Sequence, residues 1–161
     1  MEYRIERRVN PNLSRYEKEE IALAERFGSA VLKEFKDLIK CIVVFGSAAR
    51  GDGVADKKDA KKHDIDVLIV INDLTIELSS EVSQTYRVIL ERLVVEVSRR
   101  LHVQTLKLTN FWDYVRNGDP VAINMLRDGV PLYDTGFFEP IQKLLAEGRI
   151  KPSKESIWTY F

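Results

Sequence analysis

Apolar residues recur every three or four positions in two long stretches of this chain, which indicates two amphipathic helices. The first stretch runs from residue 14 to about residue 38, and the second covers about residues 80–101. This spacing places the apolar side chains on one side of a helix, where they can pack on a core. Ser14 followed by Glu17 has the form of a capping box and predicts where the first helix begins.

Short apolar runs outside these helices predict the strands of a sheet. Residues 42–45 form the first run and residues 64–72 form the second. The second run is apolar on both faces after Asp66, which favours a central strand that is covered on both sides. We expect a third strand at about residues 102–108 and a short fourth strand at residues 130–133.

The C-terminal part of the chain predicts shorter helices. These are expected at residues 111–118, 119–129, 138–146 and 154–161. The order of helices and strands indicates an α+β fold, in which a small mixed β-sheet is flanked by helices. We expect one domain over residues 1–161, with a core at about 14–110 and a C-terminal helical extension at about 111–161.

Composition narrows the class of protein. The chain has 161 residues, and its 25 Lys and Arg balance its 25 Asp and Glu, so there is no overall positive charge to attract nucleic acid. Its single cysteine, Cys41, excludes an internal disulfide. No stretch approaches the apolar length of a membrane span, and the charged N-terminal segment does not resemble a secretory signal. We therefore expect a cytoplasmic protein that does not enter a membrane.

The candidate chemistry lies around the first two predicted strands. Gly46 and Ser47 follow the first strand, while Asp64 and Asp66 stand at the start of the second. Residues i and i+2 of a strand point to the same face, about 7 Å apart, so both carboxylates would face alike. A divalent cation such as Mg²⁺ would offset their repulsion and prefers oxygen ligands of this kind. The Gly-Ser turn offers backbone N–H groups and a hydroxyl that can hold a phosphate.

Simpler interpretations exist for each of these residues by itself. Gly46-Ser47 can be an ordinary turn, and Asp64 can be a solvated strand end. Asp66 is harder to explain in this way, because it lies within the strand between Ile65 and Val67, where a buried carboxylate is costly without a partner. The combination therefore favours a metal or phosphate role.

These residues resemble the conserved pattern of the nucleotidyltransferase superfamily, which has the DNA polymerase beta-like fold. Phe45-Gly46-Ser47 and Asp64-Ile65-Asp66-Val67 match its two halves, and Arg50-Gly51 matches an extension found in many members. The chain is most similar to the small stand-alone prokaryotic members that are called minimal nucleotidyltransferases. The resemblance covers about residues 40–110.

The resemblance implies a reaction and the residues that perform it. Asp64 and Asp66 would be catalytic metal ligands for Mg²⁺, which holds a nucleoside triphosphate, expected to be ATP. An acceptor hydroxyl would attack the α-phosphorus and pyrophosphate would leave. Gly46 would let the backbone approach the phosphates, Ser47 would hydrogen-bond them, and Arg50 would offset their charge. The acceptor stays open among a protein hydroxyl, a small molecule and an RNA end.

Two of these assignments have alternatives. Arg50 is as well explained by a solvated surface position, and the same surface explanation is preferred for Lys61 and Lys62, which are further candidates for phosphate contact by proximity alone. Either His102 or His63 is a candidate base, although a lone histidine is more often an ordinary polar residue.

The chain departs from the superfamily pattern at the third predicted strand. Active members carry a third carboxylate there, whereas His102–Lys107 contains no Asp or Glu. We expect Gln104 at the aligned position, with His102 as the second choice. A neutral glutamine oxygen carries no charge, so two Mg²⁺ ions would be incompletely neutralised.

This departure leaves two functions open. The first is transfer of a nucleoside monophosphate, and the second is a catalytically weakened module that binds a nucleotide or a partner. On the resemblance, the partner would be a HEPN-type protein for which this chain acts like an antitoxin. The aromatic residues of the C-terminal half are core residues by default, but Trp158, Tyr160 and Phe161 at its end would also suit a contact with a second copy of the chain. A homo-oligomer is therefore a further expectation.

Overall fold

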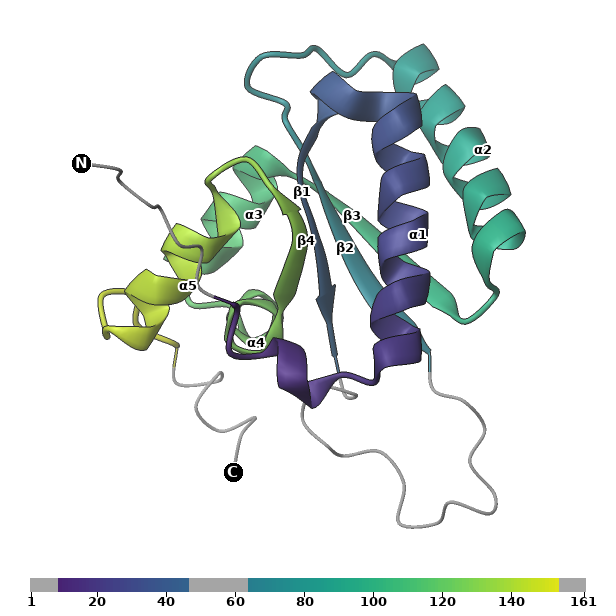
Figure 1. Ribbon diagram of the computed structural model, residues 1–161. Coiled ribbons are helices and arrows are strands. Elements are labelled where there is room, and N and C mark those ends of the chain that lie inside the picture. The colour runs from purple at the N-terminus through teal and green to yellow at the C-terminus, as the bar shows by residue number, and fades with distance from the viewer. Residues whose placement is uncertain (1–8, 47–63, 154–161) are drawn as a thin grey trace, which may run out of the picture.

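The computed structural model describes residues 9–46 and 64–153, which form a four-stranded sheet between two layers of helices (Figure 1). The strands are β1 (Ile39–Phe45), β2 (Ile65–Ile71), β3 (Leu101–Lys107) and β4 (Val130–Asp134). Their spatial order is β3-β2-β1-β4. Strand β1 pairs antiparallel with β2 and β4, while β2 and β3 run parallel. The predicted fold class, a small mixed sheet flanked by helices, is confirmed.

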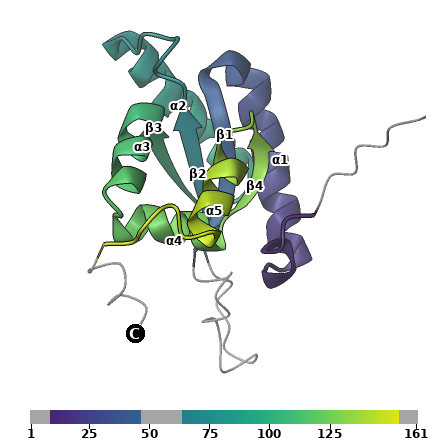
Figure 2. The ribbon, with the colours of Figure 1, turned by 90° about the vertical axis from the view of Figure 1, so that its left-hand side faces the viewer.

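Helices cover both faces of this sheet. The long helices α1 (Lys18–Phe35) and α2 (Ser80–Val97) lie on one side. The shorter helices α3 (Leu108–Arg116), α4 (Pro120–Asp128) and α5 (Phe138–Ala146) lie on the other, as Figures 1 and 2 show from two directions. Because α2 connects two parallel strands, it spans the length of the sheet between β2 and β3.

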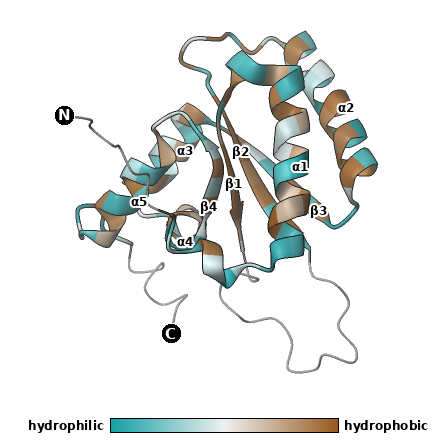
Figure 3. Cartoon of the chain, viewed as in Figure 1, coloured by the Kyte–Doolittle hydropathy of each residue, from teal (hydrophilic) through white to brown (hydrophobic). Residues whose placement is uncertain are grey.

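Strand β2 is buried on both faces, as its apolar sequence predicts (Figure 3). Ile65, Val67 and Ile69 pack in the cluster beneath α1 and α2. Leu68 and Val70 pack in the opposite cluster with the aromatic and aliphatic side chains of α3, α4 and α5. Side chains alternate along a strand, so Asp66 points toward the face that carries α3, α4 and α5. The sequence pattern thereby fixes which layer of helices the candidate carboxylate meets.

The helix starts differ in part from the sequence prediction. The proposed capping box at Ser14 is wrong, because a single 3-10 turn occupies Leu13–Arg15 and α1 begins four residues after Ser14. The Ser14 hydroxyl lies 3.5 Å from the carbonyl of Pro11 and makes no helix cap. The predicted start of α4 is correct, since the Asp119 carboxylate accepts a hydrogen bond from the Val121 amide at 2.9 Å.

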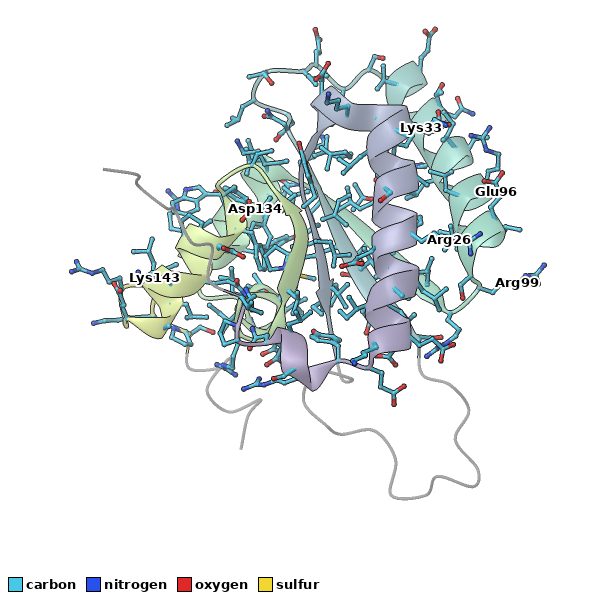
Figure 4. All side chains as sticks on the ribbon, in the orientation of Figure 1. Arg26, Lys33, Glu96, Arg99, Asp134 and Lys143 are labelled. Atoms are coloured by element: carbon cyan, nitrogen blue, oxygen red, sulfur yellow. The ribbon has the colours of Figure 1, made fainter. Side chains whose placement is uncertain are left out.

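Residues of the predicted C-terminal helical extension also complete the sheet. Strand β4 pairs along β1, and Asp134 at its end accepts hydrogen bonds from backbone amides at the start of α5. Figure 4 labels Asp134 between β4 and α5, and it labels Arg26 and Lys33 on the outer side of α1. The aromatic residues at 158, 160 and 161 lie outside the described residues, so the expected homo-oligomer stays a prediction.

No helix within residues 9–46 and 64–153 combines the length and the apolar character that a membrane span needs. The exposed sides of the long helices carry charged residues such as Arg26, Lys33 and Glu96, which Figure 4 labels.

Candidate functional site

A hollow of about 350 Å³ lies where β1 ends and β2 and β3 begin. Three strands and one helix contribute to it, and most of the contributed side chains are polar. Its lining consists of Phe45 and Gly46 from the end of β1, Asp66 from β2, His102 and Gln104 from β3, and Val121, Asn124 and Asp128 from α4. Polar side chains from separate segments thus converge on one small space, which is the arrangement expected of a ligand site.

Larger hollows exist elsewhere in the molecule, but they are less suited to chemistry. One of about 660 Å³ runs between residues 9–12, α4 and α5, and one of about 640 Å³ lies beside the start of α1. Their linings are mainly apolar, and neither includes Asp66. The smaller hollow is the candidate site because it contains the converging polar groups.

The sheet register holds Asp66 in place at the centre of this hollow. Asp66 pairs with Phe45 on one side and with His102 on the other. Its side chain is 26% exposed, and its Oδ1 lies 3.1 Å from Nδ1 of His102, whose side chain is 61% exposed. With Nδ1 protonated, the imidazole donates to the carboxylate and leaves Nε2 as the free ring nitrogen. The carboxylate is therefore oriented, yet still open to solvent and to a ligand.

Gly46 forms the other side of the Asp66 pocket. Its φ of +112° lies in a region that residues with a side chain rarely adopt. A Cβ built on Gly46 would overlap Oδ2 of Asp66 and would lie 3.1 Å from its Cγ. The resemblance implies that Gly46 lets the backbone approach the phosphates. In the structure, the group that the Gly46 backbone approaches is the candidate metal-binding carboxylate.

The position opposite Asp66 on β3 differs from the expected one. The parallel register pairs Asp66 with His102 and pairs Gln104 with Leu68, one step further into the sheet. The expectation that Gln104 aligns with the carboxylate is therefore wrong, and the second choice, His102, holds that position. The shift of two residues arises because β2 begins at Ile65, one residue later than predicted, and β3 begins at Leu101, one residue earlier than predicted. Gln104 still lines the hollow.

The remaining predicted site residues are placed less centrally. Asp64 is exposed and immediately precedes Ile65, the first residue of β2. Ser47 and Arg50 lie outside the described residues, as do Lys61, Lys62 and His63. The structure therefore brings Gly46 and Asp66 into contact, while Ser47 and Arg50 stay predictions.

Helix α4 forms a wall of the hollow that the sequence analysis did not anticipate. Val121, Asn124 and Asp128 are spaced three and four residues apart, so they lie along one side of the helix. Asp128 is 2% exposed, and its Oδ1 lies 3.5 Å from Nη1 of Arg15. The only sequence signal for this wall is the polar Asn124 between buried apolar residues of α4, and such a signal does not say which part of the fold the helix will face.

Tyr16 fixes the end of α4 against the end of β1. Its hydroxyl lies 2.9 Å from the carbonyl oxygen of Asp128 and 3.2 Å from that of Val44, to which it donates. Burial and the negative charges of Asp128 and Asp66 raise the pKa of Tyr16 well above its usual range. The phenol therefore stays protonated and serves as a donor at any physiological pH.

Asn124 contributes a polar atom with an unusual environment. Its Oδ1 is buried and has no hydrogen-bond partner within residues 9–46 and 64–153. An unsatisfied buried acceptor costs about 1–3 kcal/mol, so such atoms are uncommon in folded proteins. The hollow that Asn124 lines is the natural place for the missing donor.

The residues of the hollow can be compared with what Mg²⁺ requires. Within the described part of the chain, no three His, Cys, Asp or Glu side chains gather closely enough to hold a metal ion alone. Mg²⁺ commonly uses one or two protein carboxylates and completes its octahedron with water and substrate phosphates. The carboxylate of Asp66, which is partly open to solvent, fits that partial role. The donor set therefore suits a metal that arrives with a phosphate ligand.

Comparison with known proteins gives structural neighbours only. The chain matches no protein-family model and no curated protein sequence. Among solved structures it is similar to a candidate nucleotidyltransferase from Sulfolobus solfataricus, with a TM-score of 0.47 and 20% identity over 74% of this chain and 85% of the other.

Two further neighbours come from toxin–antitoxin systems. One is a toxin–antitoxin structure with AMP-PNP, with a TM-score of 0.44 and 16% identity over 78% of this chain and 86% of the other. The second is the tri-AMPylated HEPN toxin of Shewanella oneidensis in complex with MNT antitoxin, with a TM-score of 0.42 and 14% identity over 80% and 84%. Identity this low concerns the fold alone.

Proposed function

We propose that this protein binds a nucleoside triphosphate together with Mg²⁺ in the hollow around Asp66, and transfers a nucleoside monophosphate to an acceptor hydroxyl. The observation that carries this proposal is the contact between Asp66 and Gly46. A carboxylate that is partly open to solvent lies against a glycine that leaves no room for a side chain, at the junction of two strand ends. This geometry supports a site built for a small, charged ligand rather than a solvated loop end.

Each proposed residue has a defined task. Asp66, assisted by Asp64, would hold Mg²⁺, which when bound neutralises the phosphates and polarises the α-phosphorus. Gly46 keeps the Asp66 carboxylate accessible, and His102 orients it through the 3.1 Å contact. Ser47 and Arg50 remain the proposed phosphate contacts on the resemblance.

The reaction exchanges one bond to phosphorus for another. The acceptor oxygen forms a bond to the α-phosphorus, the bond from that phosphorus to the bridging oxygen breaks, and pyrophosphate leaves with the bonding electrons. The hydroxyl proton passes to solvent. The acceptor is proposed to be a protein hydroxyl, a small molecule or an RNA end, and ATP is the proposed nucleotide.

A second candidate function is favoured by one observation. The β3 position opposite Asp66 carries His102, and β3 contains no carboxylate at all. A site with fewer negative charges holds fewer divalent ions, so the protein would bind a nucleotide without transferring it efficiently. In this case it would act as a nucleotide-dependent partner module. The resemblance implies a HEPN-type protein as that partner.

The test starts with calorimetric titration of ATP, GTP, CTP and UTP into the protein in the presence of Mg²⁺, and then with excess EDTA. We expect one nucleotide to bind and its affinity to fall at least tenfold without the metal. Asp66→Asn should abolish this binding, because the amide is neutral and cannot compensate the metal charge. Asp113→Asn is the matched control, since Asp113 is an exposed carboxylate on α3 outside the hollow.

A measurement of pyrophosphate release then distinguishes nucleotide transfer from the partner module. Release that requires both Mg²⁺ and Asp66 supports transfer, whereas tight binding without release supports the partner module. Full nucleotide binding by Asp66→Asn would contradict both functions and would place the site elsewhere.

A further inference from the structure

The side-chain oxygen of Asn124 has no hydrogen-bond partner in the part of the chain that the structure describes, and the packing of the fold does not require a polar atom at this position. Its Oδ1 is buried and accepts no hydrogen bond from any described residue. An apolar side chain such as leucine would fill the same position without an unsatisfied acceptor and is a better helix former than asparagine. Asparagine at this place therefore lowers the stability of the ligand-free protein. A donor that arrives with a ligand would recover that loss.

The surroundings of Asn124 divide the hollow into two chemically distinct parts. Asp66, Gly46 and His102 make a charged part at the strand ends. The α4 wall combines the exposed apolar side chain of Val121 with the amide of Asn124, one helical turn away, and the buried carboxylate of Asp128. Phe45 adds an aromatic ring to the same lining.

This division matches the two halves of a nucleotide. Phosphates and their metal need the charged part, whereas a base or a sugar needs apolar surface with a few directed polar groups. The residues of α4 that line the hollow, Val121, Asn124 and Asp128, include no cation, so this wall offers phosphate no charge partner of its own. The α4 wall is thus the nucleoside side of the hollow.

We propose that Asn124 is a specificity-determining residue, whose buried Oδ1 accepts a hydrogen bond from a neutral donor of the bound nucleoside. The donor is an O–H or N–H group, supplied by the ribose 2′-hydroxyl or by the exocyclic amino group of the base. This inference rests on the proposed nucleotide binding and adds the residue that selects the nucleoside. An acceptor without a partner in the free protein penalises every ligand that lacks the donor.

The experiment compares nucleotides that differ in a single donor. The nucleoside triphosphate that binds best to the wild-type protein is titrated with Mg²⁺, alongside its 2′-deoxy form and, where the base carries an amino group, the form with oxygen in its place. Wild-type protein should bind one of these analogues about tenfold more weakly. In Asn124→Leu that ratio should fall to about one, with the parent nucleotide weakened and the analogue unchanged.

A second measurement keeps the interpretation independent of folding defects. Asn124→Leu removes the unsatisfied acceptor, so its ligand-free thermal midpoint should rise by about 2–4 °C. Val121→Ala is the matched control, because it changes the same wall without touching an acceptor. It should weaken all the nucleotides alike and leave the ratio between parent and analogue at its wild-type value.

Three outcomes would overturn this inference alone. The wild-type protein could bind the parent and both analogues equally well, in which case no donor is recognised. Asn124→Leu could weaken every nucleotide by the same factor, which would make Asn124 a metal or packing residue. Asn124→Leu could also leave every affinity unchanged, which would show that the amide does not contact the nucleotide. If the wild-type protein binds no nucleotide at all, the proposed function fails with it, so the two failures are distinguishable.

Discussion

The backbone of Gly46 occupies the space directly beside the carboxylate of Asp66, so that even one added carbon at residue 46 would overlap Oδ2. Phe45 is in register with Asp66 across the antiparallel pair, and Gly46 follows Phe45, so Gly46 lies diagonally beside Asp66. The small residue after the first strand and the acidic residue inside the second are therefore parts of one structural unit. This explains physically why the two sequence features occur together.

This contact predicts that Gly46→Ala removes nucleotide binding. The added Cβ displaces the Asp66 carboxylate, and the φ of +112° adds backbone strain of about 1–3 kcal/mol. Gly136→Ala is the matched control, since Gly136 also has a positive φ of +86° but has nothing within 4 Å of the added Cβ. Both variants should lose stability in urea unfolding, and only Gly46→Ala should lose nucleotide affinity in calorimetry. Equal affinity in the two variants would contradict the role of the contact.

The register between β2 and β3 predicts where a third carboxylate can be added. His102→Asp places a carboxylate opposite Asp66, whereas Gln104→Asp places one opposite Leu68. Without Mg²⁺, His102→Asp should lower the thermal midpoint, because two facing carboxylates repel each other. Millimolar Mg²⁺ should raise its midpoint more than that of Gln104→Asp or the wild type. A larger Mg²⁺ effect in Gln104→Asp would show that the site follows a different alignment.

The start of α3 predicts a pH dependence of stability away from the site. Burial alone would raise the pKa of Asp73, but hydrogen bonds from the side chain and backbone of Thr109, at 2.6 and 3.2 Å, outweigh burial and lower it. A carboxyl whose pKa is lower in the folded state stabilises the fold above its unfolded pKa, near 4, and loses this effect as the pH falls through the folded value.

We expect Asp73→Asn to cost about 0.5–1 kcal/mol of unfolding free energy at pH 7, a modest value because the pair is exposed to solvent. The difference from the wild type should shrink as the pH drops below 4, measured by urea unfolding at both pH values. Thr109→Val serves as the control, because it removes the hydroxyl donor and should reduce the effect of Asp73→Asn. A cost that is independent of pH would contradict the assigned charge effect.

Much of the sheet could be predicted from the chain itself. The apolar runs identify β1 and β2 to within a few residues, because a central strand must be apolar on both faces to be buried between two layers. The same alternation places Asp66 among core residues. The capping box at Ser14 failed because a Ser-x-x-Glu pattern also occurs where the chain makes a single 3-10 turn before the helix.

The local sequence determined the strands, the amphipathic helices and the small-residue and acidic motifs, because each depends on neighbours within a few positions. Tertiary structure alone decided which distant residues meet. The register of β3 brought His102 rather than Gln104 to Asp66, and the packing of α4 brought Asn124 into the same hollow. Such contacts depend on strand shifts of one or two residues and on helix placement. These are set by the packing of the whole core, and no short stretch of sequence encodes them.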